Sequence, residues 1–128
     1  MAQVLLLEPD FQLGAMYQQA LTAGGHRVIW HRTAQEALHD VDRSAVDVVI
    51  TELQLALHNG IEFLYEFRSY HEWKNIPVLV LSQVSPEQTG IGRALWDHIK
   101  IAAYHYKPRT KLRDLVEAVD KVLAPQSA

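Results

Sequence analysis

Residues 46–60 read VDVVITELQLALHNG, and this stretch decides the fold class. Residues 46–50 form a short apolar run rich in β-branched side chains, which is typical of a strand buried on both faces of a parallel sheet. Glu52 follows the run almost directly. Residues 59–60, Asn-Gly, then predict a turn, and residues 61–70 predict an amphipathic helix. The stretch is one strand-loop-helix unit that carries a carboxylate at the carboxyl end of its strand.

The same unit recurs along the whole chain. The other predicted strands are short apolar runs at residues 4–7, 26–30, 78–81 and 101–106. The other predicted helices follow them over residues 11–23, 33–41, about 85–98 and 110–123. Five such units with short connections predict an α/β fold, a five-stranded parallel sheet with helices on both faces. We expect one domain over residues 1–124 and a flexible tail over residues 125–128.

Local signals set the predicted helix ends. Asp10 and Thr110 are residue types that cap helices, and they precede the first and last helices. The fourth helix is expected to be weakened by Gly90 and Gly92. Trp73, which follows a polar stretch, is predicted to lie partly exposed near a loop.

The composition excludes several classes of protein. A net charge of −3 argues against nucleic acid as the main partner, since phosphate binding needs clustered Lys and Arg. The absence of cysteine removes disulfides and thiol chemistry, and it suits a reducing cytoplasm. The first residues lack the basic region of a signal peptide, and no apolar run approaches the length of a membrane span. We therefore expect a cytoplasmic protein without membrane contact.

Polar side chains follow four of the predicted strands. They are Glu8, with Asp10 two residues on, Glu52, Ser82 and Lys107. Because the carboxyl ends of parallel strands share one edge of a sheet, these groups are expected to converge there. A lysine can neutralise carboxylates and a serine can donate to an oxygen. Two plainer alternatives are a salt-bridged rim without a task and an exposed loop glutamate at position 52.

Four segments in this order resemble the receiver domains of two-component response regulators, which have a flavodoxin-like (βα)5 fold. They are LLLEPD, DVVITELQL with NGIEF, PVLVLS and YHYKP. The spacings are also similar to those of the family, with 44 residues from Glu8 to Glu52 and 30 from Glu52 to Ser82. The resemblance covers nearly the whole chain and implies a non-enzymatic signalling module in a phosphorelay.

The resemblance also implies roles for single residues. Glu52 stands at the position of the aspartate that accepts a phosphoryl group, and Lys107 at that of the lysine that pairs with the acyl phosphate. Ser82 and Tyr104 match the two switch residues. The main-chain carbonyl of Gln54 matches a ligand of Mg²⁺.

Two departures from the family pattern affect the chemistry. Glu8 and Pro9 fall where two acids normally hold Mg²⁺, and the side chain of Pro9 cannot ligate a cation. Glu52 is one methylene longer than aspartate. Because Mg²⁺ demands well-placed oxygens, we expect a weak Mg²⁺ site or none. Our hypothesis is an atypical receiver that does not depend on phosphorylation, in which Glu52 places a fixed negative charge near Ser82 and Lys107.

The implied partners are proteins, either a histidine kinase or a downstream regulator. A homodimer through the face of the fourth helix, fifth strand and fifth helix is a further expectation. Two alternatives remain open from the sequence. One is a receiver that is still phosphorylated on Glu52 or Asp10, and the other is a flavodoxin-like binder of a small molecule. No glycine-rich phosphate loop follows the first strand, because Glu8, Pro9 and Asp10 occupy that turn.

Overall fold

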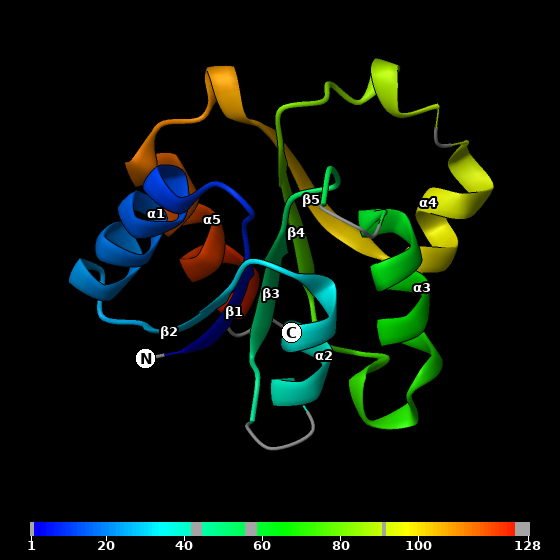
Figure 1. Ribbon diagram of the computed structural model, residues 1–128, viewed down its shortest axis with the longest axis horizontal. Helices are drawn as coiled ribbons and strands as arrows, with labels where there is room; N and C mark the ends of the chain where they lie inside the picture. Colours follow the sequence, from blue (N-terminus) through cyan, green and yellow to red (C-terminus); the bar gives the residue numbers. More distant parts are fainter. Residues whose placement is uncertain (1, 42–44, 56–58, 91, 125–128) are drawn as a thin grey trace.

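A single parallel sheet organises the chain in a computed structural model, which describes residues 2–41, 45–55, 59–90 and 92–124 (Figure 1). The five strands lie in the order β2-β1-β3-β4-β5, and each neighbouring pair is parallel. The strands are β1 (Gln3–Leu7), β2 (Arg27–His31), β3 (Val48–Thr51), β4 (Val78–Ser82) and β5 (Ile101–Tyr106). The α-helices are α1 (Phe11–Ala23), α2 (Ala34–Val41), α3 (Gly60–Ser69), α4 (Arg93–Ile99) and α5 (Leu112–Leu123). The predicted fold class is confirmed.

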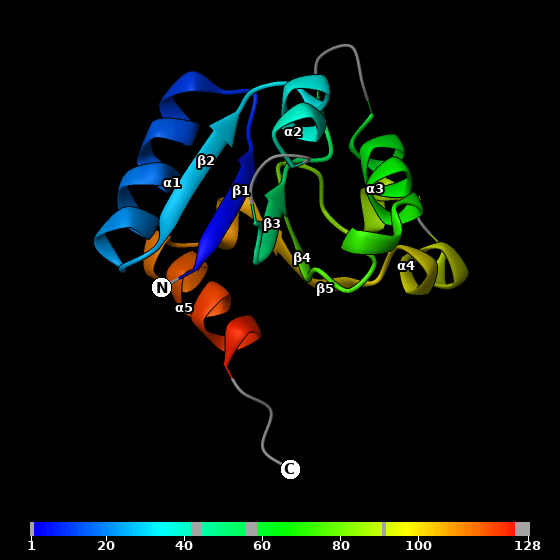
Figure 2. The ribbon, with the colours of Figure 1, turned by 90° about the horizontal axis from the view of Figure 1, so that it is seen from below.

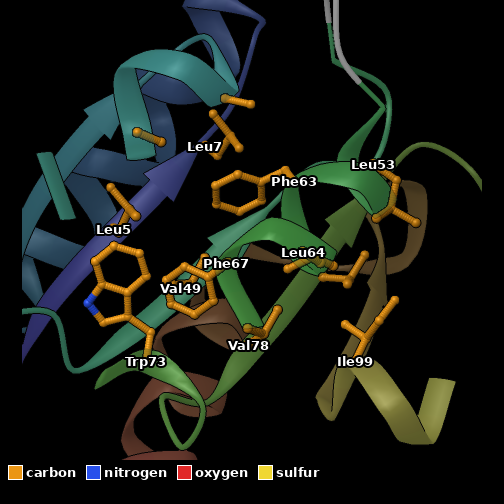
Figure 3. Close-up of a cluster of buried hydrophobic side chains, with 13 residues drawn as sticks. Leu5, Leu7, Val49, Leu53, Phe63, Leu64, Phe67, Trp73, Val78 and Ile99 are labelled. Atoms are coloured by element: carbon orange, nitrogen blue, oxygen red, sulfur yellow. The ribbon is translucent and has the colours of Figure 1, made fainter. Parts of the chain in front are cut away.

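Helices cover both faces of the sheet, with α1 and α5 on one side and α2, α3 and α4 on the other (Figure 2). Successive strand residues point to opposite faces, so each strand serves two cores. The core under α1 and α5 contains Val4, Leu6, Val48, Ile50, Leu79 and Leu81 with Tyr17, Leu21, Leu115 and Val119. The core under the other helices contains Leu5, Leu7, Val49, Val78 and Val80 with Phe63, Leu64, Phe67, Trp73 and Ile99 (Figure 3). This division explains why the strands read as continuous apolar runs.

The predicted fourth helix is wrong in its first half. The chain forms only a short 3₁₀ turn at Glu87–Thr89, and α4 begins at Arg93. Between them Gly90 has a φ of 68°, in the left-handed region that ends a helix. The two glycines therefore break the helix rather than weaken it.

Two details of the last helix also differ from the prediction. Lys111, not Thr110, is the residue before α5, and its N–H donates to the Asp114 carboxylate at 2.9 Å. The Thr110 hydroxyl donates instead to the carbonyl of Tyr106. Leu112, the first residue of α5, is 37% exposed.

Trp73 is buried, contrary to the prediction of partial exposure, with 8% of its surface accessible. Its ring stacks on Phe67 with centroids 5.5 Å apart and contacts Tyr70 at 4.4 Å. Figure 3 shows the indole beside Leu5 and Phe67. Tyr65 and Tyr70 are the aromatic side chains of this region that stay exposed, at 44% and 43%.

The boundaries of β3 differ slightly from the prediction, since the strand begins at Val48 rather than at Val46. The predicted tail over residues 125–128 lies outside the described residues. No helix in the described ranges combines the length and apolar character that crossing a membrane would need.

Candidate functional site

Strand register brings the four predicted groups together at the carboxyl edge of the sheet. Leu7 pairs with Thr51 across β1 and β3, so the next residues, Glu8 and Glu52, lie side by side. Ser82 ends β4 and pairs with Tyr106, the last residue of β5, which Lys107 follows. The loops that leave this edge lie at the top of Figure 1.

The Glu52 carboxylate is the centre of the site, and its residue is only 3% exposed. Oε1 accepts hydrogen bonds from Lys107 Nζ at 2.8 Å and from the Gln83 N–H at 3.0 Å. Oε2 accepts from the Ser82 hydroxyl, from the Leu53 N–H at 2.6 Å and from the Gln54 N–H at 3.1 Å. Two carboxylate oxygens offer about four acceptor positions. These five donors therefore satisfy the carboxylate fully.

Glycine at position 60 makes this arrangement possible. A Cβ on Gly60 would lie 2.6 Å from the Cα of Leu53 and 2.7 Å from the carbonyl oxygen of Glu52. The first turn of α3 thus contacts the backbone that carries Glu52. Asn59 caps the same helix by accepting from the Ile61 N–H at 2.7 Å. The Asn-Gly pair, predicted to form a turn, thus places the start of α3 directly against the backbone of Glu52 and Leu53.

Lys107 joins the two acids of the site. Its Nζ lies 2.6 Å from Glu8 Oε1 and 2.8 Å from Glu52 Oε1, and its side chain is 7% exposed. A buried carboxylate is stabilised only if it is paired and hydrogen-bonded. Lys107 therefore pairs with two carboxylates at once. With both acids ionised, the three side chains together carry one net negative charge.

The environments of the two acids shift their pKa values in opposite directions. Burial is the largest influence on both, and it raises the pKa of Glu8 above 4.5 despite the hydrogen bonds from Lys107 and the Asp10 N–H. For Glu52 burial also acts upward. The hydrogen bonds from Lys107, Ser82 and the amides of Gln54 and Gln83 outweigh it, and the pKa of Glu52 falls below 4.5. The directions differ because Glu52 accepts more hydrogen bonds than Glu8 does.

A chain of hydrogen bonds leads from Glu52 to the α4 side of the molecule. The Ser82 hydroxyl donates to Glu52 and accepts from the Val84 N–H at 3.1 Å. The Tyr104 hydroxyl donates to the carbonyl of Val84. The Tyr104 ring in turn stacks on Trp96, with centroids 5.4 Å apart. Both predicted switch residues thus belong to one connected network that begins at Glu52.

The remaining predicted groups are committed to other contacts. Asp10 caps α1, since its Oδ1 accepts from the Leu13 N–H at 2.8 Å, and its own N–H donates to Glu8 Oε2 at 3.0 Å. Gln54 faces Glu52 with its N–H and pairs with Asn59 in an isolated bridge. Pro9 offers the site no side-chain ligand, because its ring carries no donor or acceptor. Its carbonyl accepts from Arg32 Nε at 2.9 Å.

Tyr17 of α1 is a neighbour of the site that the sequence reasoning missed. Its residue is 8% exposed. Burial first, and then the negative charges of Glu8, Glu52 and Asp10, raise the pKa of its phenol to about 12. It also lines a cavity of about 650 Å³ together with Gln83 and Lys107. Its place among apolar residues of α1 is that of an ordinary core side chain, so the sequence carries no signal for this position.

Comparison with known proteins agrees with this geometry. The family model described as "Response regulator receiver domain" matches residues 4–120. The KDP operon transcriptional regulatory protein KdpE of Escherichia coli K12 is 33% identical over 91 residues, which are 71% of this chain and 39% of that protein. The transcriptional regulatory protein CpxR of Klebsiella pneumoniae is 27% identical over 96% of this chain and 50% of its own length. The chain thus spans half or less of these curated relatives.

Solved structures show the same fold. The chemotaxis protein CheY4 of Vibrio cholerae is 24% identical with a TM-score of 0.84, and the match covers 96% of this chain and 99% of that one. The non-phosphorylated HemR receiver domain of Leptospira biflexa is also 24% identical, with a TM-score of 0.82 over 100% of this chain and 98% of that one. The extent of the family match decides the classification: this chain belongs to the response regulator receiver domain family.

Proposed function

We propose that this receiver domain works without phosphorylation and that Glu52 supplies a permanent negative charge at the place of a phosphoryl group. The observation that carries the proposal is the set of donors on its carboxylate. Ser82 and Lys107 both bond to it, as do three backbone N–H groups. By resemblance, the serine and the lysine are the residues that a phosphorylated receiver directs toward its phosphoryl oxygens.

Glu52 reproduces only part of the charge of a phosphorylated side chain. A glutamate carries one negative charge, whereas a phosphorylated side chain carries roughly −1.5 to −2. A coupling free energy of about 1–3 kcal/mol is nevertheless typical of allosteric proteins. The network from Glu52 through Ser82 and Val84 to Tyr104 supports a bias toward one conformation of the α4 and β5 face.

The same donors argue against phosphoryl transfer to Glu52. An attacking carboxylate oxygen needs a free lone pair directed at the phosphodonor. Both oxygens of Glu52 are satisfied by Ser82, Lys107 and backbone N–H groups. The Asp10 carboxylate, the other possible acceptor, is engaged as the cap of α1.

The residues present do not fit a Mg²⁺ ion. Octahedral coordination at about 2.1 Å requires several free oxygens. Neither carboxylate oxygen of Glu8 is free to bind a cation, since Oε1 pairs with Lys107 and Oε2 accepts a hydrogen bond from the Asp10 N–H. Pro9 replaces an acid, and the described residues contain no group of three His, Asp or Glu side chains arranged to hold a metal. We infer that the ammonium of Lys107 performs the neutralisation that a cation would otherwise supply.

The proposed partner is a protein, a histidine kinase or a downstream regulator, and not nucleic acid or a membrane. The surface that we assign to it is the face formed by α4, β5 and α5, with a homodimer through this face as a further candidate. The stacked pair of Trp96 and Tyr104 supports this choice, since it connects that face to Glu52. In this proposal the cluster of Glu8, Glu52 and Lys107 catalyses no reaction, and the domain is not an enzyme.

The test is the intact mass of the chain after incubation with Mg²⁺ and acetyl phosphate. Four proteins are compared: the wild type, Glu52→Asp, Pro9→Asp/Glu52→Asp, and Glu117→Asp as a control on the exposed side of α5. We expect a phosphoryl mass only in the double variant, because it alone restores both the acceptor and the second acid ligand. A phosphoryl mass on the wild type would overturn the proposal.

A second experiment measures whether the charge of Glu52 affects the conformation of the α4 and β5 face. In Glu52→Gln the side chain keeps its size and loses its charge. We expect the NMR resonances of Trp96 and Tyr104 to move in this variant, and to remain in place in Glu117→Gln. Unmoved resonances in Glu52→Gln would contradict a constitutive bias while leaving the mass result intact.

A further inference from the structure

The ends of α3 and α4 and the start of β5 lie at the edge of the sheet opposite to Glu52 (Figure 1). Side chains from these segments line a second cavity. Its volume is about 510 Å³. It is lined by Tyr65, Arg68, Ser69, Lys74, His98 and Lys100. Small-molecule sites in proteins have volumes of roughly 300–1,000 Å³. The size of the cavity therefore suits a ligand of that class.

The lining is strongly basic. Three of the six side chains are Arg or Lys and a fourth is His, and no Asp or Glu lines the cavity in the part of the chain that the structure describes. The two lysines, Lys74 and Lys100, are exposed. Positive groups gathered in a concave surface raise the local concentration of anions. The whole chain has a net charge of −3, so the positive lining of this cavity is opposite in sign to the charge of the protein.

Arg68 connects segments beside the cavity through carbonyl groups, and within the described ranges no carboxylate pairs with its guanidinium. Its guanidinium donates to four carbonyl oxygens, those of Trp73, Ile76, Ile99 and Lys100, at 2.7 to 3.1 Å. Carbonyl groups satisfy donors but carry no net charge. Among the described contacts, these four bonds use four of the five N–H donors that a guanidinium has. The fifth donor and the positive charge remain for a ligand.

Lys100 has an unusual backbone for its residue type. It is the described non-glycine residue with a positive φ, 61° with ψ of 54°, at the end of α4. Glycine or asparagine usually occupies this left-handed position at the end of a helix. Residues held in such conformations occur preferentially at ligand sites. Here the conformation places a lysine at the rim of the cavity.

An aromatic pair completes the lining. The rings of Tyr65 and His98 have centroids 5.5 Å apart and an interplanar angle of 43°. Tyr65 is 44% exposed, so its ring is open to a ligand. A planar base can stack on such a ring, as bases do on aromatic side chains of nucleic-acid-binding proteins.

We propose that this cavity binds a small phosphorylated ligand of the nucleotide class. The phosphates lie against Lys74, Lys100 and the free N–H of Arg68, and the base lies against Tyr65 and His98. Charge-assisted hydrogen bonds to phosphate are the strong contacts of such a site. The proposal is independent of Glu52, since the two sites lie at opposite edges of the sheet.

The experiment is an NMR titration of the full chain with ADP. We expect saturable shifts of the Tyr65 and His98 ring signals and of the Lys100 amide. Lys74→Gln and Lys100→Gly each remove one charge, and glycine keeps the left-handed backbone at position 100. Each variant is expected to weaken binding about fivefold, the effect of losing one exposed ion pair. Lys121→Gln on α5 is the control and should bind as the wild type does.

Further probes separate the two parts of the ligand. Inorganic pyrophosphate and adenosine are each expected to bind more weakly than ADP at the same residues. Pyrophosphate binding as tightly as ADP would overturn the role of the base, and adenosine doing so would overturn the role of the phosphates. Absence of shifts with millimolar ADP would overturn the site. Tighter binding of a poly-glutamate peptide to the same residues would assign the surface to a protein partner instead.

Discussion

The Nζ of Lys107 lies 2.8 Å from Oε1 of Glu52, and the two side chains are 7% and 3% exposed. The pair joins the fifth strand to the third across 55 residues of sequence. Since Glu8 shares the same ammonium, this one lysine compensates both buried acids of the edge.

Lys107→Met is therefore expected to destabilise the domain strongly. Breaking a buried ion pair from one side costs about 3–5 kcal/mol, because it leaves an uncompensated charge. The measurement is urea unfolding at pH 7, followed by tryptophan fluorescence. Lys121→Met, at an exposed site in α5, serves as the control, with a change within about 0.5 kcal/mol. Equal losses in the two variants would show that the pair contributes nothing.

Glu8 gives the stability a dependence on pH above 4.5. Its folded pKa is raised above the ordinary value of 4.5, so the folded chain keeps a proton that the unfolded chain releases. The stability that this proton contributes is lost as the pH rises through the folded pKa. We expect the free energy of unfolding of the wild type, minus that of Glu8→Gln, to decrease from pH 4.5 upward. A difference that stays flat over pH 4 to 8, as expected for the exposed control Glu117→Gln, would contradict the raised pKa.

Glu52 makes the stability depend on pH in the opposite direction, and at pH values below 4.5. Its folded pKa is lowered below 4.5, so its contribution is present above the unfolded pKa and is lost as the pH falls through the folded one. The wild type should therefore lose stability relative to Glu52→Gln on acidification below 4.5. Denaturation curves between pH 3 and 5 measure this difference, and a gain in that range would disprove the assignment.

Substitution of Gly60 measures how tightly the start of α3 packs against the backbone of Glu52 and Leu53. A Cβ at this position meets the Leu53 backbone at 2.6 Å, whereas nothing lies within 4 Å of a Cβ on Gly92. Overpacking of this kind costs typically about 1–3 kcal/mol. Gly60→Ser should therefore destabilise the domain by that amount and shift the Gln54 amide resonance. Gly92→Ser, at the start of α4, should leave both quantities nearly unchanged, and similar effects of the two substitutions would refute the packing argument.

Tyr104→Phe removes only the hydroxyl that donates to the carbonyl of Val84. The expected loss of stability is about 1 kcal/mol, the typical net value of one hydrogen bond. Because the ring still stacks on Trp96, we expect the indole N–H resonance of Trp96 to shift in the same direction as in Glu52→Gln. Shifts in unrelated directions would mean that the hydroxyl and the carboxylate are not coupled. Tyr65→Phe, on α3, is the control.

The strands and the acid edge could be predicted because both depend on local pattern and chain order. The first helix was predicted with its observed limits, since Asp10 caps it and glycines follow it. The convergence of Glu8, Glu52, Ser82 and Lys107 required only the rule that parallel strands end at one edge. The functional roles of these residues remain predictions.

Features that depend on distant contacts could not be predicted. Trp73 is buried because it belongs to the core cluster that also contains Leu5 and Val49, which its polar neighbours in sequence do not reveal. The backbone N–H donors of the site, such as that of Gln83, carry no residue signature at all. Arg68 did offer a signal, because a basic residue in the last turn of a helix often binds carbonyl groups.

The single ammonium shared by two acids also bears on how the domain assembles. Glu8 and Glu52 follow the neighbouring inner strands β1 and β3, while Lys107 follows the edge strand β5, which is synthesised last. Until β5 docks, closing this edge would bury two carboxylates without a cation, so water must stay there. Desolvation of the edge and docking of β5 are therefore one cooperative step. We expect the amide protons of Leu53 and Gln54 to exchange with solvent at the rate of the β5 amides, which native-state hydrogen exchange can measure.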